Sequence, residues 1–260
     1  MSRLKTSDYA PVNGLNMYYE IYGEGAIPLV LIHGGGSTIE TSFGTLLPLL
    51  SEHNKIIAVE LQAHGRTSDR AAPESFEQDA DDVAELLKHL QVNKANFFGF
   101  SNGGTTTLQI AIRHPGMVNK IVVASANYQR EGLIPGFFDG MKNATLADMP
   151  TTLQAAFLKV TPDKNLLQVM FNRDKERMLN FKDIADDALG SIKAPSLLIG
   201  SDQDVIVPEH VVKMSRLITG ARLIILPGVH GAFIESAESG VTGSKLPGVT
   251  AVLVQHFLNE

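Results

Sequence analysis

One segment has the residue types and spacing of a serine nucleophile. Residues 99–103 read G-F-S-N-G, which matches a G-x-S-x-G pattern centred on Ser101. The apolar residues 95–100 predict a buried strand and the residues that follow predict a helix, so Ser101 is expected at a sharp turn between them. Glycine at 99 and 103 removes side chains that would clash across such a turn. The alternative is an ordinary serine that caps the helix.

Strand and helix patterns alternate on both sides of this turn. An alternating pattern predicts a strand at residues 15–22. Short apolar runs predict strands at residues 28–32, 56–61, 95–100, 121–124, 195–200 and 221–226. Apolar spacing and helix-start signals predict helices at 43–50, from the capping pattern at Ser75 to Leu90, at 102–114, from 208 onward and at 249–258. This alternation favours an α/β fold, with a mostly parallel sheet and helices on both faces.

The alternation lapses over residues 128–193. That stretch has helical composition and no clear strand. An insertion of this size within an α/β order predicts a helical cap, or lid, and not a second independent domain. We therefore expect residues 1–127 and 194–260 to form the core domain and residues 128–193 to form the cap.

The predicted cap is rich in large apolar side chains. Phe137, Phe138 and Met141 are the candidates for binding substrate, because ligand pockets are mostly apolar and methionine adapts to irregular shapes. The alternative is that these side chains only pack the cap against the sheet.

The composition narrows the class of protein. The chain has 260 residues, of which 44% are hydrophobic, and a formal net charge of −6. The negative charge argues against nucleic acid and anionic membranes as partners, and no apolar run is long enough to span a bilayer. The absence of cysteine excludes disulfides, thiolate metal sites and a cysteine nucleophile. A cytoplasmic protein that acts on a small molecule, without metal or cofactor, is expected.

Five segments together resemble the α/β-hydrolase superfamily, over a range from about Asn13 to the C-terminus. They are LVLIHGGGS, AVELQAHGRTSD, FFGFSNGG, LLIGSDQDVIVPEH and LPGVHG. The resemblance implies a sheet of about eight strands, a helical cap after the sixth strand and catalytic residues in the order serine, aspartate, histidine. It does not choose a substrate.

The general base is expected to be a histidine, because a serine hydroxyl attacks well only when a base takes its proton. In the implied order the base comes late in the chain, which leaves His210, His230 and His256. His210 begins a predicted helix and His256 lies inside one. His230 follows a predicted strand on a loop between Gly228 and Gly231, so His230 is the predicted base.

The acid that orients this base is predicted to be Asp204. Both Asp202 and Asp204 are expected on the loop after the strand at 195–200. In proteins of the resembled superfamily the acid commonly lies four residues before a helix-opening proline, and Asp204 has that spacing to Pro208. Asp202 is expected to bond loop N–H groups as a turn residue.

An oxyanion hole requires two N–H donors. One is expected from Asn102, the residue after the nucleophile, and the other from the glycine loop. By its place in the His-Gly pattern of the resembled superfamily, Gly35 is favoured over Gly36. His33 is expected to be structural.

Several functions remain open to the sequence. A serine hydrolase that cleaves an ester is favoured, and cleavage of an amide or carbon–carbon bond, perhydrolase (haloperoxidase-like) activity and a non-catalytic binding role are the alternatives. A dinucleotide-binding module would explain the glycines at 34–36 and the acid Glu60. It requires glycine at position 39, which is Ile39, and it leaves Ser101 unexplained.

Overall fold

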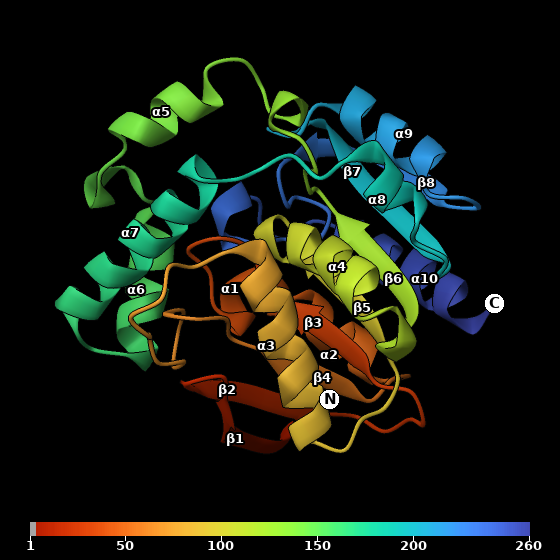
Figure 1. The fold of residues 1–260 in the computed structure, drawn as a ribbon, viewed down its shortest axis with the longest axis horizontal. Coiled ribbons are helices and arrows are strands. Elements are labelled where there is room, and N and C mark those ends of the chain that lie inside the picture. The colour runs from red at the N-terminus through yellow and green to blue at the C-terminus, as the bar shows by residue number, and fades with distance from the viewer. Residues whose placement is uncertain (1–3) are drawn as a thin grey trace.

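An eight-stranded sheet forms the centre of the molecule, which we describe over residues 4–260 of a computed structural model (Figure 1). The strands are β1 Leu4–Val12, β2 Leu15–Tyr22, β3 Leu29–Ile32, β4 Ile56–Val59, β5 Ala95–Phe100, β6 Val118–Ala124, β7 Ser196–Gln203 and β8 Arg222–Val229. Their order is β1-β2-β4-β3-β5-β6-β7-β8, with β2 antiparallel to both β1 and β4 and every other pair parallel. This is the mostly parallel α/β fold that the sequence predicts.

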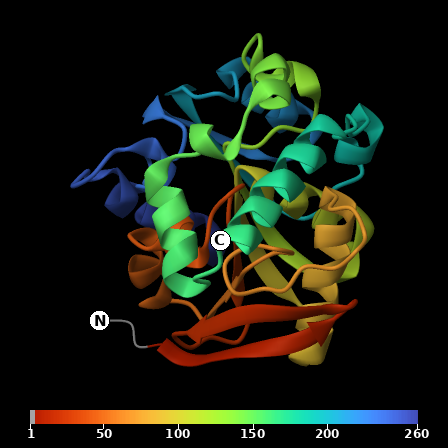
Figure 2. The ribbon, with the colours of Figure 1, turned by 90° about the vertical axis from the view of Figure 1, so that its left-hand side faces the viewer.

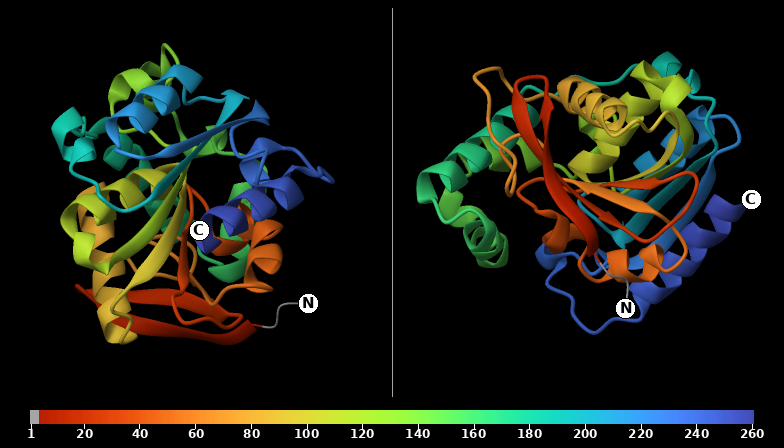
Figure 3. Two further views of the ribbon diagram at one scale, coloured as in Figure 1. Left: turned by 90° about the vertical axis from the view of Figure 1, so that its right-hand side faces the viewer. Right: turned by 90° about the horizontal axis from the view of Figure 1, so that it is seen from below.

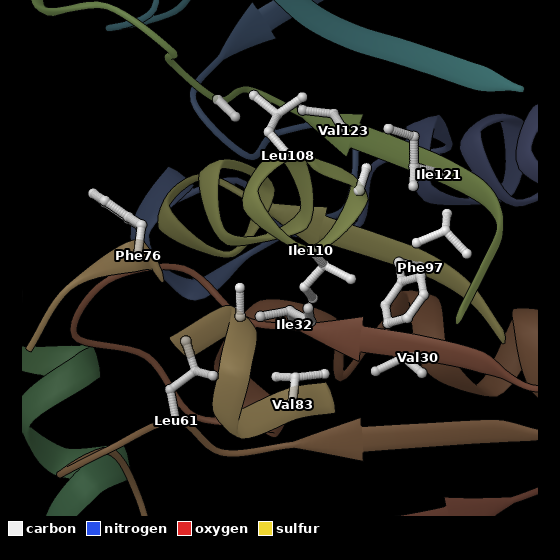
Figure 4. Close-up of a cluster of buried hydrophobic side chains, with 14 of the residues drawn as sticks. Val30, Ile32, Leu61, Phe76, Val83, Phe97, Leu108, Ile110, Ile121 and Val123 are labelled. Carbon is white, nitrogen blue, oxygen red and sulfur yellow. The ribbon is translucent and has the colours of Figure 1, made fainter. Parts of the chain in front are cut away.

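Helices cover both faces of the sheet (Figure 3). One face carries α3 Phe76–His89, α4 Asn102–Arg113 and α9 Pro208–Leu217, and the other carries α1 Ile39–Phe43, α2 Leu46–Ser51 and α10 Leu246–Asn259. Successive residues of the short apolar strands point to opposite faces. In β3, Val30 and Ile32 therefore join the core under α3 and α4 (Figure 4), whereas Leu29 and Leu31 pack toward α1 and α2. Two buried faces explain why these strands are apolar throughout.

Local signals set the limits of the helices that carry the site. Ser75 caps α3 by accepting from Gln78 N at 3.1 Å, which satisfies one of the free N–H groups at the helix start. Helix α4 begins directly after Ser101 and ends at Arg113, just before Pro115 opens the short 3-10 helix η1 Pro115–Met117.

The segment between β6 and β7 is helical and lies beside the sheet (Figure 2). It contains η2 Arg130–Gly132, α5 Phe137–Asn143, η3 Leu146–Asp148, α6 Thr151–Val160, α7 Lys164–Leu179 and α8 Asp186–Gly190. Its helices α6 and α7 share a small apolar cluster that includes Leu153, Phe157 and Met170. The fold therefore has the helical cap insertion that the sequence predicts.

Several predictions about elements differ from the structure. The strand predicted at 56–61 ends at Val59, and β8 continues to Val229, so Gly228 lies in the strand and not on the loop of His230. Strand β1 is missing from the sequence-based prediction, and the single helix predicted at 43–50 is two short helices separated by Gly44 and Thr45. Strand β7 continues to Gln203, so Asp202 lies within the strand and not on the loop after it. No helix in residues 4–260 is long and apolar enough to cross a membrane.

Candidate active site

Ser101 occupies a strained turn between β5 and α4. Its φ of 54° and ψ of −122° lie outside the regions that a non-glycine residue ordinarily adopts. A Cβ on Gly99 would collide with Gly103 O, and a Cβ on Gly103 would collide with Ile32 O, so both flanking positions require glycine. The turn sets Ser101 at the carboxyl edge of the sheet, where the loops after β3, β6, β7 and β8 also meet.

The structure brings the three predicted catalytic side chains together. Ser101 Oγ lies 3.0 Å from His230 Nε2, and His230 Nδ1 lies 2.6 Å from Asp204 Oδ1. Asp202 makes a different contact, because its Oδ1 accepts from Gly228 N at 2.8 Å. Because the carboxylate of Asp204 can only accept, Nδ1–H of His230 donates to it, which leaves Nε2 free to take the proton of Ser101.

The surroundings of Asp204 keep its carboxyl ionised. Burial disfavours the carboxylate, but hydrogen bonds from His230, from Ser125 Oγ and from Ile206 N at 3.0 Å hold the pKa of Asp204 below its ordinary value. Burial acts against the imidazolium of His230, yet the contact with Asp204 raises the pKa of His230. Ser125, at the end of β6, was missed by the sequence-based prediction, because only folding brings it to a residue 79 positions away.

Backbone N–H groups without an acceptor among residues 4–260 lie beside Ser101. Neither Asn102 N nor Gly35 N has an acceptor, whereas Gly36 N donates to Asp174. A Cβ on Gly35 would lie 2.6 Å from Asn102 Nδ2, so a larger residue there would displace the side chain of Asn102. This geometry favours Gly35 over Gly36 as the partner of Asn102 in an oxyanion hole.

His33 holds the glycine loop in place. Its Nδ1 donates to Gly34 O at 2.7 Å and its Nε2 accepts from Leu61 N at 3.0 Å. Burial, together with nearby His64, lowers the pKa of His33 to about 3, so the ring is neutral. A neutral ring with one donated and one accepted bond fits the structural role expected from the sequence.

A cavity of about 590 Å³ adjoins the three catalytic candidates. Ser101, Asn102, His230, Gly35 and Gly36 lie in its wall. Most of the remaining wall is apolar and comes largely from the cap segment, including Leu133, Phe137, Met141, Met149, Leu153, Met170 and Phe171.

Of the three predicted substrate-binding residues, Phe137 and Met141 line this cavity and Phe138 does not. The ring of Phe138 instead lies 3.5 Å from the guanidinium carbon of Arg130, in a cation–π contact. Its position next to Phe137 in a helix turns it about 100° away, which explains the difference.

A buried charged cluster joins α7 to the core beneath the glycine loop. Arg177 Nη1 lies 2.6 Å from Asp79 Oδ2 and 3.2 Å from Glu74 Oε1, and Arg177 also pairs with Asp174. His64 Nε2 contacts Asp174 Oδ2 at 2.9 Å. The sequence-based prediction missed this cluster, because charges three residues apart on a helix ordinarily indicate a solvated face.

Known proteins resemble this chain both in sequence and in fold. The chain is 26% identical over 256 residues to the serine hydrolase BPHL of Homo sapiens, covering 90% of this chain and 83% of that protein. Among solved structures, the meta-cleavage product hydrolase of Pseudomonas fluorescens IP01 gives a TM-score of 0.79 at 19% identity over 98% of each chain. The enol-lactonase of Burkholderia xenovorans LB400 gives 0.76 at 23% identity, over 97% of this chain and 100% of that one. At such identities the two structures show a shared fold alone.

The family itself is shown by a sequence profile. The profile of the alpha/beta hydrolase fold matches residues 27–181, which is more than half of the chain. The matched range includes the glycine loop after β3 and the turn at Ser101. The chain therefore belongs to the alpha/beta hydrolase fold family.

Proposed function

We propose that the protein is a serine hydrolase that cleaves a carboxylic ester through an acyl-enzyme. The observation that carries the proposal is the unbroken hydrogen-bonded series from Ser101 through His230 to Asp204 in the wall of a cavity. A nucleophile, a base and an orienting acid in this geometry are what acyl transfer requires.

In the proposed reaction Ser101 Oγ bonds to the ester carbonyl carbon while its proton passes to His230 Nε2. The carbonyl electron pair moves onto oxygen, and the resulting anion accepts hydrogen bonds from Gly35 N and Asn102 N. Asp204 stabilises the imidazolium formed at His230. The alcohol then leaves with the proton from His230, and a water molecule attacks the acyl-enzyme by the same route to release the acid.

The names of the similar proteins support hydrolysis but describe different substrates. A serine hydrolase, a meta-cleavage product hydrolase and an enol-lactonase are among them. Residues 128–193 are proposed to act as the cap that shapes the pocket, since this segment supplies most of its apolar wall. A panel of esters of graded acyl length, with an amide and a carbon–carbon substrate beside them, separates the ester proposal from its alternatives.

The decisive experiment removes the nucleophile. In Ser101→Ala, kcat for the best ester of the panel should fall by roughly 10⁴ to 10⁶, because one member of a catalytic triad accounts for about that much. A fluorophosphonate probe should label the wild type and leave Ser101→Ala unlabelled.

Ser215→Ala is the matched control, since its hydroxyl donates to Val212 O within α9, away from the cavity. Its turnover and labelling should equal those of the wild type. Turnover by Ser101→Ala within tenfold of the wild type would contradict the proposed nucleophile, and an unlabelled wild type with no turnover would favour a binding role.

A further inference from the structure

The wall of the cavity carries four charged side chains, and three of them have partners. The four are Asp148, Asp174, Lys175 and Glu238. Asp148 accepts from Thr145 N and Thr145 Oγ1, both at 2.8 Å, and Lys175 Nζ donates to Ala144 O at 2.6 Å. Asp174 is held by the charged cluster that includes Arg177.

Glu238 is the exception. It lies in η4 Ala237–Ser239, on the loop after His230. Its carboxylate has no hydrogen bond or ion pair with any of residues 4–260, and its Oε1 is enclosed by protein. A carboxylate oxygen enclosed without a partner is unfavourable, because that oxygen has lost water without gaining a donor. Burial accordingly raises the pKa of Glu238, although the nearby His230 acts in the opposite direction.

The position of Glu238 connects the core with the cap. Its neighbour Ala237 packs against the apolar cluster of the cap, which contains Met149 and Leu153. Asn127 lines the same cavity and its enclosed Nδ2 also lacks a partner. The cavity wall therefore contains an acidic side chain without a protein partner, and a polar ligand in the cavity could supply that partner.

We propose that Glu238 determines specificity by binding a protonated amine in the acyl or alcohol part of the substrate, whose ester carbonyl lies at Ser101. The inference rests on the proposed function. A cationic donor is favoured over a neutral one because the carboxylate of Glu238 has no ion pair and no hydrogen bond among residues 4–260, and a bound cation would balance its charge. A charge-assisted hydrogen bond from an ammonium group satisfies both the acceptor and the charge.

The test compares two esters of equal size, one ending in an ammonium group and the other in a methyl group at the same position. The measured quantity is the ratio of kcat/KM for the ammonium ester to that for the methyl ester. The wild type should favour the ammonium ester, and Glu238→Gln should lower the ratio by about tenfold or more, the loss typical of a hydrogen bond to a charged group. Glu238→Lys should lower the ratio further.

Glu235→Gln is the matched control. It removes the same charge from the same loop, but Glu235 lies outside the cavity wall and accepts from Gly243 N. Its ratio should stay at the wild-type value. Calorimetric binding of both esters to Ser101→Ala measures the same preference without turnover.

Two results would overturn the inference. One is a wild type that binds and cleaves both esters equally well. The other is an equal loss for both esters in Glu238→Gln, which would show that Glu238 acts through the imidazolium of His230. If the proposed hydrolysis itself fails, neither ester is turned over, and the binding ratio on Ser101→Ala still decides whether the site selects a cation. A melting temperature for each variant separates a misfolded protein from a changed preference.

Discussion

Asp202 and Asp204 are two residues apart, yet their carboxylates have different partners. Asp204 is 7% exposed and lies between His230 and Ser125, whereas Asp202 is exposed and accepts from Gly228 N across the β7–β8 pair. The end of β7 explains the difference, because Asp202 is still within the strand and Asp204 has just left it. One carboxylate can orient a base and the other satisfies the backbone of a neighbouring strand.

This difference predicts opposite outcomes for two substitutions. In Asp204→Asn, the new amide can donate to His230 Nδ1 and trap the ring in the wrong tautomer, so kcat near pH 7 should fall by up to about 10⁴. In Asp202→Asn, the retained Oδ1 still accepts from Gly228 N, and kcat should stay within a few-fold of the wild type. Steady-state kinetics on the same ester measures both. A large loss in Asp202→Asn beside a nearly unaffected Asp204→Asn would reverse the assignment.

At the scale of the elements, helix α5 presents its side chains in two directions. Phe137 and Met141 are four residues apart, so they share one face of the helix, and both line the cavity. Phe138 lies outside the cavity wall, against Arg130. The helix therefore supplies both a test of the pocket and its control.

We expect Phe137→Ala and Met141→Ala to shift the preferred acyl length of the substrate toward longer chains, because each substitution enlarges the cavity. The measurement is kcat/KM across a graded ester series. Phe138→Ala removes a ring of the same size from the same helix, and this variant should keep the acyl-length preference of the wild type. A shift in Phe138→Ala equal to those of the other two variants would mean that α5 acts through its packing and not through its cavity-facing side chains.

The elements that the sequence predicts well are those with continuous apolar runs. Strands β3 to β8 carry such runs, β2 has an alternating pattern, and the turn at Ser101 has a local signature of glycines. Strand β1 was missed because its first six residues are all exposed, so no apolar pattern marks it. The helix predicted at 43–50 was right for residues 46–50, which belong to α2, and wrong for Gly44 and Thr45, which separate α2 from α1.

The residues of the site can also be divided into those that local sequence patterns predict and those that they do not. Ser101 and the glycine loop could be found from local patterns, whereas Ser125, Asp174 and Glu238 depend on contacts between distant segments. Phe138 was predicted from its type alone, and the rotation along α5 decides its actual position. Local chemistry thus identifies the catalytic candidates, and tertiary packing identifies the residues that surround them.

At the scale of the whole molecule, the buried charged cluster ties the cap to the core through His64. His64 Nδ1 lies 2.8 Å from Gln62 O and its Nε2 lies 2.9 Å from Asp174 Oδ2. Both partners can only accept, so both ring nitrogens donate and the ring is an imidazolium. Burial alone would disfavour that charge, but Asp174, with a smaller contribution from Glu74, raises the pKa of His64 to about 9.

A histidine whose pKa is higher in the folded state than in the unfolded state makes stability depend on pH. The folded state then binds more protons between the unfolded pKa of about 6.5 and the folded pKa of about 9, so the free energy of unfolding should fall as pH rises through this window. His64→Gln removes the titrating group. Near pH 7 the variant should be less stable by roughly 3 kcal/mol, which is the free energy of such a shift, and the difference should shrink toward pH 10.

Urea denaturation of the wild type and His64→Gln at pH 7, 8, 9 and 10 measures this difference, in which titrations that are independent of His64 cancel. The titration of Glu74 remains in the difference, because burial raises its pKa to about 8 and His64, 3.8 Å away, opposes that rise. His256→Gln is the control, because His256 has a 72% exposed side chain and lies 3.0 Å from the carboxylate of Glu260. It should follow the pH dependence of the wild type. A stability difference between His64→Gln and the wild type that stays constant from pH 7 to 10 would show that His64 stabilises by packing and not by its charge. The charged contacts between α7 and the core would then be those of Arg177 with Glu74 and Asp79 and of Arg173 with Asp69.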